Sequence, residues 1–255
     1  MGKSLLKSWI KSNIKNISIV DPILARKKRK IYNTTVYGSL NKINDINDFN
    51  VIFFAVKPQI LNKAIIPYKK LSLKNKLIIS IVAGKKTKYF ERQFGKNVSV
   101  IRTMPNLPAL VAKGVTCLFK NKNVNLGQKK LSEKLFKSVG DFFWVNNENY
   151  INKFTAISGS GPAYYYYFIE CLKDAGLKIG LNNKIAYDIA EKTAIGSIHL
   201  LEKTKENASS LRKKIAIKGG TTEAAIRELQ NNNKMRKIVL SGVNAAYKKA
   251  IKIGK

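Results

Sequence analysis

The first 146 residues alternate short apolar runs with stretches of helical spacing. The run Val51–Val56 is apolar throughout, as expected for a strand that is covered on both faces. The stretch that contains Leu5, Leu6, Trp9 and Ile10 instead has the spacing of an amphipathic helix. This alternation predicts an open parallel sheet. The predicted strands are Ile17–Val20, Thr34–Tyr37, Val51–Val56, Leu77–Val82, Val98–Ile101, Val115–Phe119 and Phe142–Val145.

The pattern changes after Asn146. Over residues 161–254 only helical spacing is found, and it is interrupted at Leu181-Asn182 and at Asn231–Asn233. Pro162 suits the first turn of a helix, because proline lacks the backbone N–H that is unpaired there in any case. The last helical pattern runs over Met235–Ile253. The second part of the chain is therefore predicted to be all-helical.

This change of pattern predicts two domains. Residues 1–147 are expected to form an α/β domain, and residues 148–255 an all-α domain. No internal repeat or low-complexity linker separates the two. The fold class predicted from the sequence is thus α/β followed by all-α.

The composition is strongly basic. Lys and Arg number 48 against 15 Asp and Glu, so the formal net charge is +33. Nucleic-acid binding would account for such a charge, because basic surfaces release counterions from phosphate. Only seven of the basic residues are Arg, however, and the recognition of phosphates and bases favours Arg. The lysines are spread along the chain among abundant Asn and Ile, which share A/T-rich codons. Genome composition is the favoured explanation, and no nucleic-acid partner is expected.

Several other classes of function lack support. The chain has no apolar run of about eighteen residues, so no membrane span is expected. The N-terminus lacks the apolar segment of a secretory signal, which favours a cytoplasmic location. Cys117 and Cys171 are far apart in apolar surroundings and are predicted to be buried free thiols, with no metal site. The single histidine, His199, is predicted to be structural or at the surface.

Five short strings of residues carry the most specific information. Each is weak alone, but together they extend over most of the chain in a fixed order. They are Ala55-Val56-Lys57-Pro58-Gln59, Ser80-Ile81-Val82-Ala83-Gly84, Arg102-Thr103-Met104-Pro105-Asn106-Leu107-Pro108-Ala109-Leu110, Ser158-Gly159-Ser160-Gly161-Pro162-Ala163-Tyr164 and Lys218-Gly219-Gly220-Thr221-Thr222. In this order they resemble the motifs of the pyrroline-5-carboxylate reductase family.

The resemblance implies a Rossmann-like parallel-sheet domain followed by a helical substrate-binding and dimerisation domain. It implies the reduction of 1-pyrroline-5-carboxylate to L-proline by hydride transfer from NAD(P)H, the last step of proline biosynthesis. It also implies a homodimer, which in some members assembles into a larger ring of dimers. The apolar stripe at residues 164–168 is compatible with a dimer interface and equally with core packing.

Two alternatives stay open. One is another imine or β-hydroxyacid-type reductase with the same two-domain plan. The other is a truncated relative with impaired cofactor binding that acts as a basic binding protein.

The carboxyl ends of parallel strands line the crevice in which nucleotides bind. Two of the motifs stand at such ends, which predicts contacts with the cofactor, although Lys57 is also explained as a solvated lysine. The resemblance adds further residues from the first third of the chain. The residues assigned to the cofactor are Met1, Asp21, Asn41, Ala55, Val56, Lys57 and Ala83.

Asp21 bears on the choice of cofactor. An acidic residue at the end of the second Rossmann strand holds the ribose 2′-OH of NAD and repels the 2′-phosphate of NADP. The sequence therefore predicts a weak preference for NADH. The basic cluster Arg26–Lys30 follows closely and could offset that repulsion.

The loop Lys218–Thr222 precedes a good helix start. Successive backbone N–H groups at such a start form an anion site that would fit the carboxylate of a small imino acid, although a plain Thr N-cap is the alternative. The resemblance assigns Gly220, Thr221 and Thr222 to the substrate, with the catalytic Thr222 hydroxyl near the ring nitrogen. It also assigns Glu148 to the substrate, and a surface carboxylate is the alternative there. Lys218 replaces a proline that is usual in the family.

The N-terminus departs from the family, which begins with a strand and a Gly-rich phosphate-binding loop. Met1-Gly2 match only the last two residues of that loop. A central strand is thus missing, and its loss is expected to open two sheet edges. This departure predicts that the gene product starts upstream of Met1.

Overall fold

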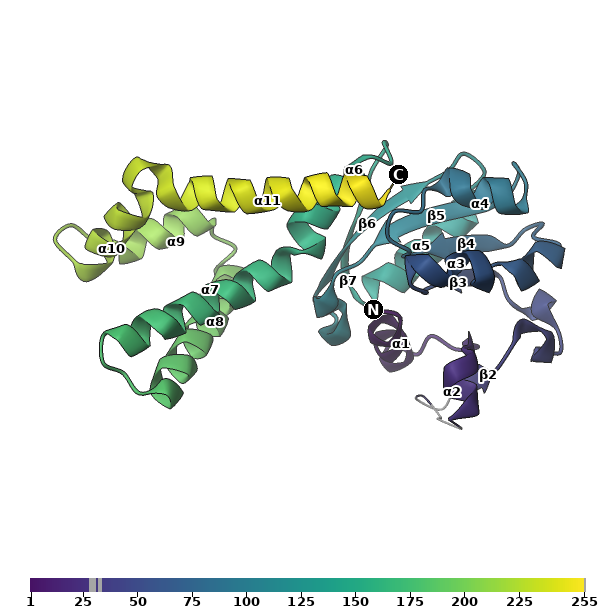
Figure 1. Ribbon diagram of the computed structural model, residues 1–255, viewed down its shortest axis with the longest axis horizontal. Helices are drawn as coiled ribbons and strands as arrows, with labels where there is room; N and C mark the ends of the chain where they lie inside the picture. The colour runs from purple at the N-terminus through teal and green to yellow at the C-terminus, as the bar shows by residue number, and fades with distance from the viewer. Residues whose placement is uncertain (28–30, 32–33, 255) are drawn as a thin grey trace. The chain divides into compact units, whose positions relative to one another are not determined.

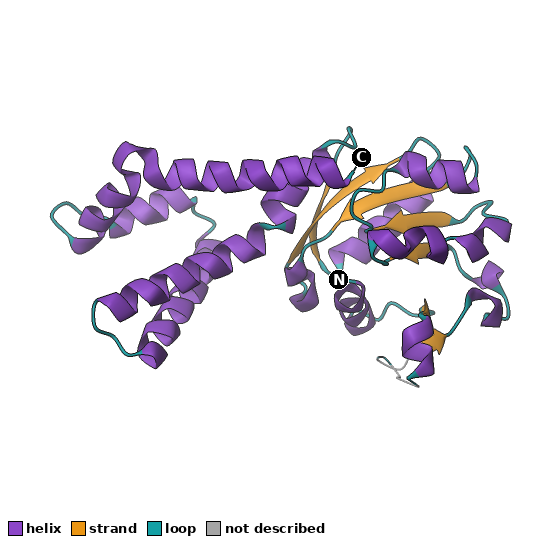
Figure 2. Cartoon of the chain, in the orientation of Figure 1, coloured by secondary structure: helices purple, strands orange, loops and turns teal. Residues whose placement is uncertain are grey.

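The computed structural model of the protein describes residues 1–27, 31 and 34–254 (Figure 1). The internal contacts divide the chain into two compact units. The first contains Met1–Ser160 and Ala246–Lys255, and the second contains Gly161–Ala245. Within the described residues every strand lies in the first unit (Figure 2), which confirms the predicted order of α/β and then all-α. The domain boundary expected between residues 147 and 148 stays a prediction.

Every predicted strand is present, with bounds that shift by a few residues. The larger sheet has the order β3-β4-β5-β6-β7, and a separate sheet contains β1 and β2. The strands are β1 (Ser18–Val20), β2 (Thr35–Tyr37), β3 (Val51–Phe54), β4 (Leu77–Ser80), β5 (Ser99–Met104), β6 (Gly114–Lys120) and β7 (Gly140–Trp144).

The pairing of the strands is parallel with one exception. β5 and β6 are antiparallel, with Met104 opposite Cys117, so the predicted parallel sheet is confirmed with one antiparallel pair among the described strands. The connection over residues 105–113 explains the exception. A parallel partner would need a crossover of a dozen or more residues, whereas this short connection only turns the chain back.

β1 and β3 are edge strands. Among the described residues β1 pairs only with β2, and β3 pairs only with β4. Helix α1 (Gly2–Lys11) is fixed to the unit by two long-range hydrogen bonds, from Ser8 Oγ to the Ala109 carbonyl at 2.7 Å and from Trp9 Nε1 to the Leu135 carbonyl at 2.9 Å.

Apolar side chains cover both faces of the larger sheet. Along β4, Leu77 and Ile79 belong to one buried cluster, whereas Ile78 belongs to the other. Successive strand residues point to opposite faces, so a strand that is apolar throughout must be covered on both. The helices of this unit are α1, α2 (Pro22–Arg26), α3 (Pro58–Ala64), α4 (Thr87–Phe94), α5 (Leu126–Lys137) and α6 (Tyr150–Phe154), with 3-10 turns at Leu40–Lys42, Ile46–Asp48, Ile66–Lys70 and Leu107–Val111.

The second unit begins at the predicted helix start. Pro162 lies in the first turn of α7, and the predicted breaks near Asn182 and at Asn231–Asn233 are confirmed. Asn182 caps the next helix through a hydrogen bond from the Ile185 N–H. The helices are α7 (Gly161–Lys178), α8 (Asn183–Thr204), α9 (Ala208–Ile215), α10 (Thr221–Gln230) and α11 (Lys234–Ile253), the last of which ends in the first unit.

Large apolar side chains of the second unit are exposed. The stripe at residues 164–168 on α7 has exposed fractions between 37% and 67%, so packing inside the chain does not account for it. His199 is exposed, which confirms its surface placement. Cys117 is buried as predicted, but Cys171 is exposed, so the prediction of two buried thiols is wrong for Cys171. Among the helices described, none combines the length and apolar character of a membrane span.

Candidate functional site

The first predicted cofactor segment stands at the end of β3. Lys57 is the N-cap of α3, and both Lys57 and Ala55 are exposed. The start of α1 adjoins this segment, because a Cβ added at Gly2 would lie 3.0 Å from the Ala55 Cβ. The structure thus brings Met1, the N-cap of α1, to the neighbourhood of Ala55. No side chain caps α1, and its first turn has no acidic residue, so its N–H groups suit an anionic phosphate.

Asp21 and Asn41 follow β1 and β2, the two strands of the smaller sheet. Asp21 directly follows β1 and caps α2, with its Oδ1 accepting from the backbone N–H groups of Ile23 at 2.9 Å and Leu24 at 3.0 Å. Asn41 is exposed in a 3-10 turn. In the basic cluster that follows Asp21, Lys28–Lys30 lie outside the described residues.

A cleft opens at the ends of β4 and β5. Ala83 is the one predicted cofactor residue that lines it. Gly84 has φ +75°, and a Cβ there would lie 2.2 Å from the Ile253 carbonyl oxygen, so only glycine fits beside the end of α11. The cleft is lined by Val82, Ala83, Gly84, Arg102, Thr103, Met104, Ile151, Asn152, Thr155, Ala250 and Ile253.

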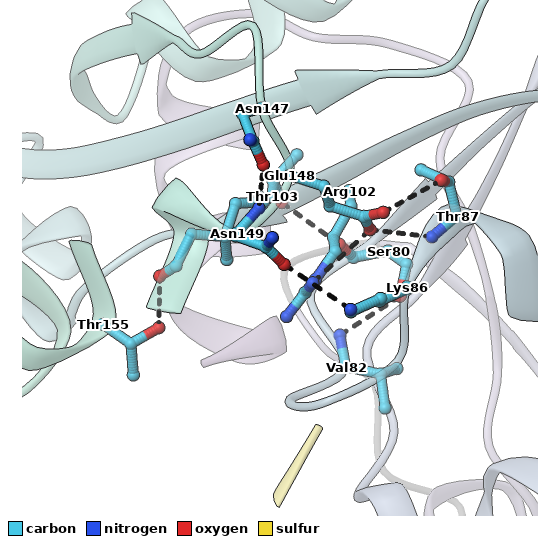
Figure 3. A network of polar contacts seen from close by, with 11 residues as sticks. Ser80, Val82, Lys86, Thr87, Arg102, Thr103, Asn147, Glu148, Asn149 and Thr155 are labelled. Carbon is cyan, nitrogen blue, oxygen red and sulfur yellow. Dashed lines mark hydrogen bonds and ion pairs between the residues drawn. The ribbon is translucent and has the colours of Figure 1, made fainter. Parts of the chain in front are cut away.

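Glu148 is held in a polar network beside the cleft (Figure 3). Its Oε1 accepts from the Thr87 backbone N–H at 2.8 Å, and its Oε2 accepts from the Thr87 hydroxyl at 3.2 Å. The Arg102 guanidinium donates to Oε1 at 3.4 Å. Glu148 is 15% exposed, so it is not the plain surface carboxylate that the sequence left open. The hydrogen bonds with Thr87 connect Glu148 to the start of α4. Its contact with substrate stays a prediction.

Burial governs the electrostatics of this network. Desolvation lowers the pKa of the Arg102 guanidinium, and the Glu148 carboxylate opposes that shift. Desolvation also raises the pKa of the neighbouring Cys117 thiol to about 12, against the opposing charge of Arg102. At neutral pH the thiol is therefore protonated and inert, and Arg102 with Glu148 forms the charged pair.

Two of the sequence motifs are joined by one side chain. Asn106 donates from Nδ2 to the Ser158 carbonyl at 3.0 Å and accepts at Oδ1 from the Val115 N–H at 2.8 Å. Ser158 belongs to a π-helical turn, Thr155–Gly159, that precedes α7. Such turns are frequent at functional sites. The Asn106 contact therefore fixes the backbone of this turn to the sheet.

Sequence reasoning did not single out Arg102 and Asn152, which line the cleft. The signal for Arg102 was present, because a charged residue that follows the apolar run Val98–Ile101 needs a buried partner. Asn152 has no comparable signal, since it lies in a polar stretch at the start of the helical region. Only the packing of α6 against the sheet places it at the cleft.

The predicted substrate loop lies in the second unit. Gly219 has φ +78°, and Gly220 is the N-cap of α10 without a side-chain cap, so the alternative of a plain Thr N-cap is excluded. Thr221 and Thr222 are the first residues of that helix. Glu223 folds back, and its Oε2 accepts from the Gly219 N–H at 2.7 Å. The helix start can receive an anion at Thr221 and Thr222, with one carboxylate nearby.

These features define a class of protein: a two-domain, dinucleotide-dependent oxidoreductase with a Rossmann-like sheet and a helical second domain. Residues 148–253 match the family model for pyrroline-5-carboxylate reductase dimerisation, and residues 1–84 match the model for NADP oxidoreductase, coenzyme F420-dependent. A pyrroline-5-carboxylate reductase of Haemophilus influenzae is 33% identical, with 89% of this chain and 84% of that protein covered. The chain belongs to the pyrroline-5-carboxylate reductase family.

Solved structures agree over the whole chain. A pyrroline-5-carboxylate reductase from Coxiella burnetii is 29% identical, with a TM-score of 0.88 and with 100% of this chain and 95% of that chain covered. A Plasmodium falciparum pyrroline carboxylate reductase with NADP bound is 31% identical, with a TM-score of 0.83 and the same coverage. The match of the helical region to the dimerisation model supports the expected homodimer.

Proposed function

We propose that this protein reduces 1-pyrroline-5-carboxylate to L-proline with NAD(P)H, the last step of proline biosynthesis. The observation that carries the proposal is the likeness of the whole chain to reductases with this name, in sequence and in fold. The alternative of another imine or β-hydroxyacid-type reductase has no comparable support. The alternative of a truncated relative that acts as a basic binding protein has no comparable support either.

The chain's own groups have two tasks in this reaction: they bind the pyrophosphate of the cofactor, and they leave room for the cofactor to approach closely. The reduced nicotinamide supplies the hydride when it is bound. The uncapped start of α1, with Met1 at its N-cap, suits the pyrophosphate, and the small residues Ala55 and Ala83 leave room for close approach. These groups position the reactants, and no acid–base side chain is needed for the hydride itself.

The loop before α10 is proposed to bind the substrate carboxylate. The backbone N–H groups at Thr221 and Thr222 point out of a helix start that no side chain caps, which is the arrangement that favours an anion. The Thr222 hydroxyl is proposed to donate to or accept from the ring nitrogen. Glu148 is also proposed to bind the substrate, and its described partners are Arg102 and Thr87.

Asp21 supports a preference for NADH over NADPH. Its Oδ1 is fixed by two backbone N–H groups at the end of β1, so a carboxylate is held where a 2′-phosphate would come. The ratio of kcat/KM for the two cofactors checks this. A strong preference for NADPH would refute it, and Asp21→Ser is expected to shift the ratio towards NADPH.

The proposal extends to the assembly and the location of the protein. The exposed stripe at residues 164–168 suits the homodimer interface, and a larger ring of dimers is proposed by resemblance to the family. Free Cys117 and Cys171 suit a reducing compartment, here the cytoplasm. Light scattering of the purified protein gives the number of subunits.

Proline formation from the cyclic imine is the decisive test. The full chain is incubated with the imine and either NADH or NADPH, and proline is quantified by chromatography together with cofactor oxidation. Equal amounts of proline and oxidised cofactor are expected. Cofactor oxidation with a panel of other imines or β-hydroxyacids, without proline formation, would favour the runner-up reductase. Salt-sensitive retention on nucleic acid without any reduction would favour the basic binding protein.

A further inference from the structure

The connection between α9 and α10 contains a tight turn. Residues 216–220 form this connection (Figure 1). The Gly220 N–H donates to the Ile217 carbonyl at 3.1 Å, and Gly219 has φ +78°. These two features define a type II β-turn, with Lys218 and Gly219 as its central residues. The second central position needs a positive φ, which glycine adopts at little cost.

The first central position of the turn is occupied by a lysine. Proline is favoured there in type II turns, because its ring fixes φ at about −65°. Lys218 is exposed and lacks this restriction. Its backbone N–H has no hydrogen-bond acceptor within residues 1–27, 31 and 34–254, so a proline would fit without the loss of a bond. The stability of the turn therefore depends on contacts other than those of Lys218.

The side chain of Glu223 supplies such a contact. Its Oε2 accepts from the Gly219 N–H at 2.7 Å, across four positions of sequence. Glu223 is half-buried and lies in the first turn of α10, where the partial positive charge of a helix start stabilises a carboxylate. A hydrogen bond with a charged acceptor is stronger than one between neutral groups. Glu223 therefore holds the Gly219 peptide in the orientation that the turn needs.

The contact with Glu223 leaves the start of α10 open. Glu223 accepts from the N–H of Gly219, and the N–H of Gly220 is used within the turn. The N–H groups of Thr221 and Thr222, which are the first two residues of the helix, have no acceptor in the part of the chain that the structure describes. The turn thus fixes the helix start without blocking it.

We infer that Glu223 is a positioning residue for the reaction. It holds the turn in the conformation that presents the N–H groups of Thr221 and Thr222 to the substrate carboxylate. The inference rests on the proposed function, because it concerns the loop that is proposed to bind this carboxylate. The negative charge of Glu223 would by itself repel a carboxylate. Ordering of the loop and repulsion therefore predict opposite changes in KM when Glu223 is replaced.

Steady-state kinetics of the full chain with the cyclic imine test the inference. Glu223→Leu removes the acceptor and the charge, and its KM for the imine should rise about fivefold while the KM for the cofactor is unchanged. Glu223→Gln keeps an acceptor oxygen and should stay within about twofold of wild type. Glu228→Leu is the matched control, because Glu228 lies on the same helix and accepts from Lys234 Nζ at 2.7 Å. It should change neither KM. A lower KM for the imine in both Glu223 variants would show that repulsion dominates and would overturn the inference.

A proline in the turn should replace the contact with Glu223. Lys218→Pro restricts the backbone to the conformation of a type II turn. When it is combined with Glu223→Leu, the KM for the imine should return to within about twofold of that of Lys218→Pro alone. Lys218→Gln removes the same charge without restricting φ, so it should not restore the KM of Glu223→Leu. Equal KM values for the two double variants would contradict the positioning role.

Hydrogen exchange gives a readout that needs no substrate. Followed by NMR, the Gly219 amide should exchange about fivefold more slowly in wild-type protein than in Glu223→Leu. Equal exchange rates would overturn the inference and leave the proposed function intact. If wild-type protein forms proline but Glu223→Leu has an unchanged KM for the imine, only the inference fails. If wild-type protein forms no proline although the Gly219 amide is protected, the proposed function fails and the role of Glu223 in it fails too.

Discussion

The cleft at the ends of β4 and β5 is made by side chains from distant parts of the chain, whereas the loop before α10 is made by consecutive residues. Arg102 and Glu148 meet across 46 positions of sequence, and both are largely buried. Gly219–Thr222 is a partly exposed helix start whose chemistry is that of its own backbone. The cleft therefore depends on the folding of the whole unit, and the loop depends on local conformation.

Mutations at the cleft and at the loop should therefore differ in their effects. Changes at the cleft should lower the free energy of unfolding, because they disturb packing or leave a buried group unpaired. Changes at the loop should lower activity and leave that free energy nearly unchanged.

Gly84→Ala should have the largest effect. The substitution combines an unfavourable φ with a clash, because the new Cβ would meet the Ile253 carbonyl oxygen at 2.2 Å. We expect a loss of about 3 kcal/mol in the free energy of unfolding, measured by urea denaturation. Gly95→Ala is the control, since Gly95 also has a positive φ but no atom lies within 4 Å of its added Cβ. It should cost about 1 kcal/mol. Equal losses would show that the end of α11 does not rest on Gly84.

Arg102→Met should come next. It leaves Glu148 partly buried without its cation, which costs about 2–3 kcal/mol in the free energy of unfolding by the same assay. Adding Glu148→Gln should recover part of this loss, because the unpaired charge is removed. The exposed pair of Lys137 with Asp141 at 2.9 Å is the control, and Lys137→Met should cost less than about 0.5 kcal/mol despite the shorter distance. A larger loss in the exposed pair would contradict the role of burial.

Thr222→Val tests the loop. Loss of the hydroxyl proposed to contact the ring nitrogen should lower kcat/KM for the imine about tenfold, which corresponds to about 1.4 kcal/mol of transition-state stabilisation. The free energy of unfolding should change by less than about 0.5 kcal/mol, since the position is near the surface. Thr204→Val is the matched variant, because its hydroxyl donates to the Leu200 carbonyl at the end of α8. It should leave kcat/KM unchanged, and an equal loss there would remove Thr222 from the site.

The pH dependence of the free energy of unfolding is a second test of the buried residues around Arg102. Burial raises the pKa of the Cys117 thiol from 9.0 to about 12. Between these values the unfolded chain has lost the thiol proton and the folded chain has kept it, so this contribution to stability is complete below about pH 9 and is lost as the pH rises towards 12. Cys117→Ala should remove a slope of about 1 kcal/mol per pH unit in urea denaturation. The exposed Cys171→Ala is the control, and identical profiles for the two variants would refute the effect.

The sequence alone predicted the elements of secondary structure and the local chemistry at their ends. The apolar run Val51–Val56 predicted a strand, Pro162 predicted a helix start, and the loop at Gly220 predicted an uncapped helix N-terminus or a Thr cap, of which the structure has the first. These signals are readable because they depend on periodicity and on the backbone chemistry of adjacent residues.

Tertiary structure decided the rest. The antiparallel pairing of β6, the ion pair of Arg102 with Glu148 and the meeting of Arg102 and Asn152 at one cleft follow from packing between segments that are far apart in sequence. The exposure of Cys171 was likewise decided by the fold. No local sequence pattern predicts which polar side chain of a buried strand will face which helix, because this contact depends on how whole helices and strands pack together. The sequence therefore determined which residues could do chemistry, and the fold determined which of them share a site.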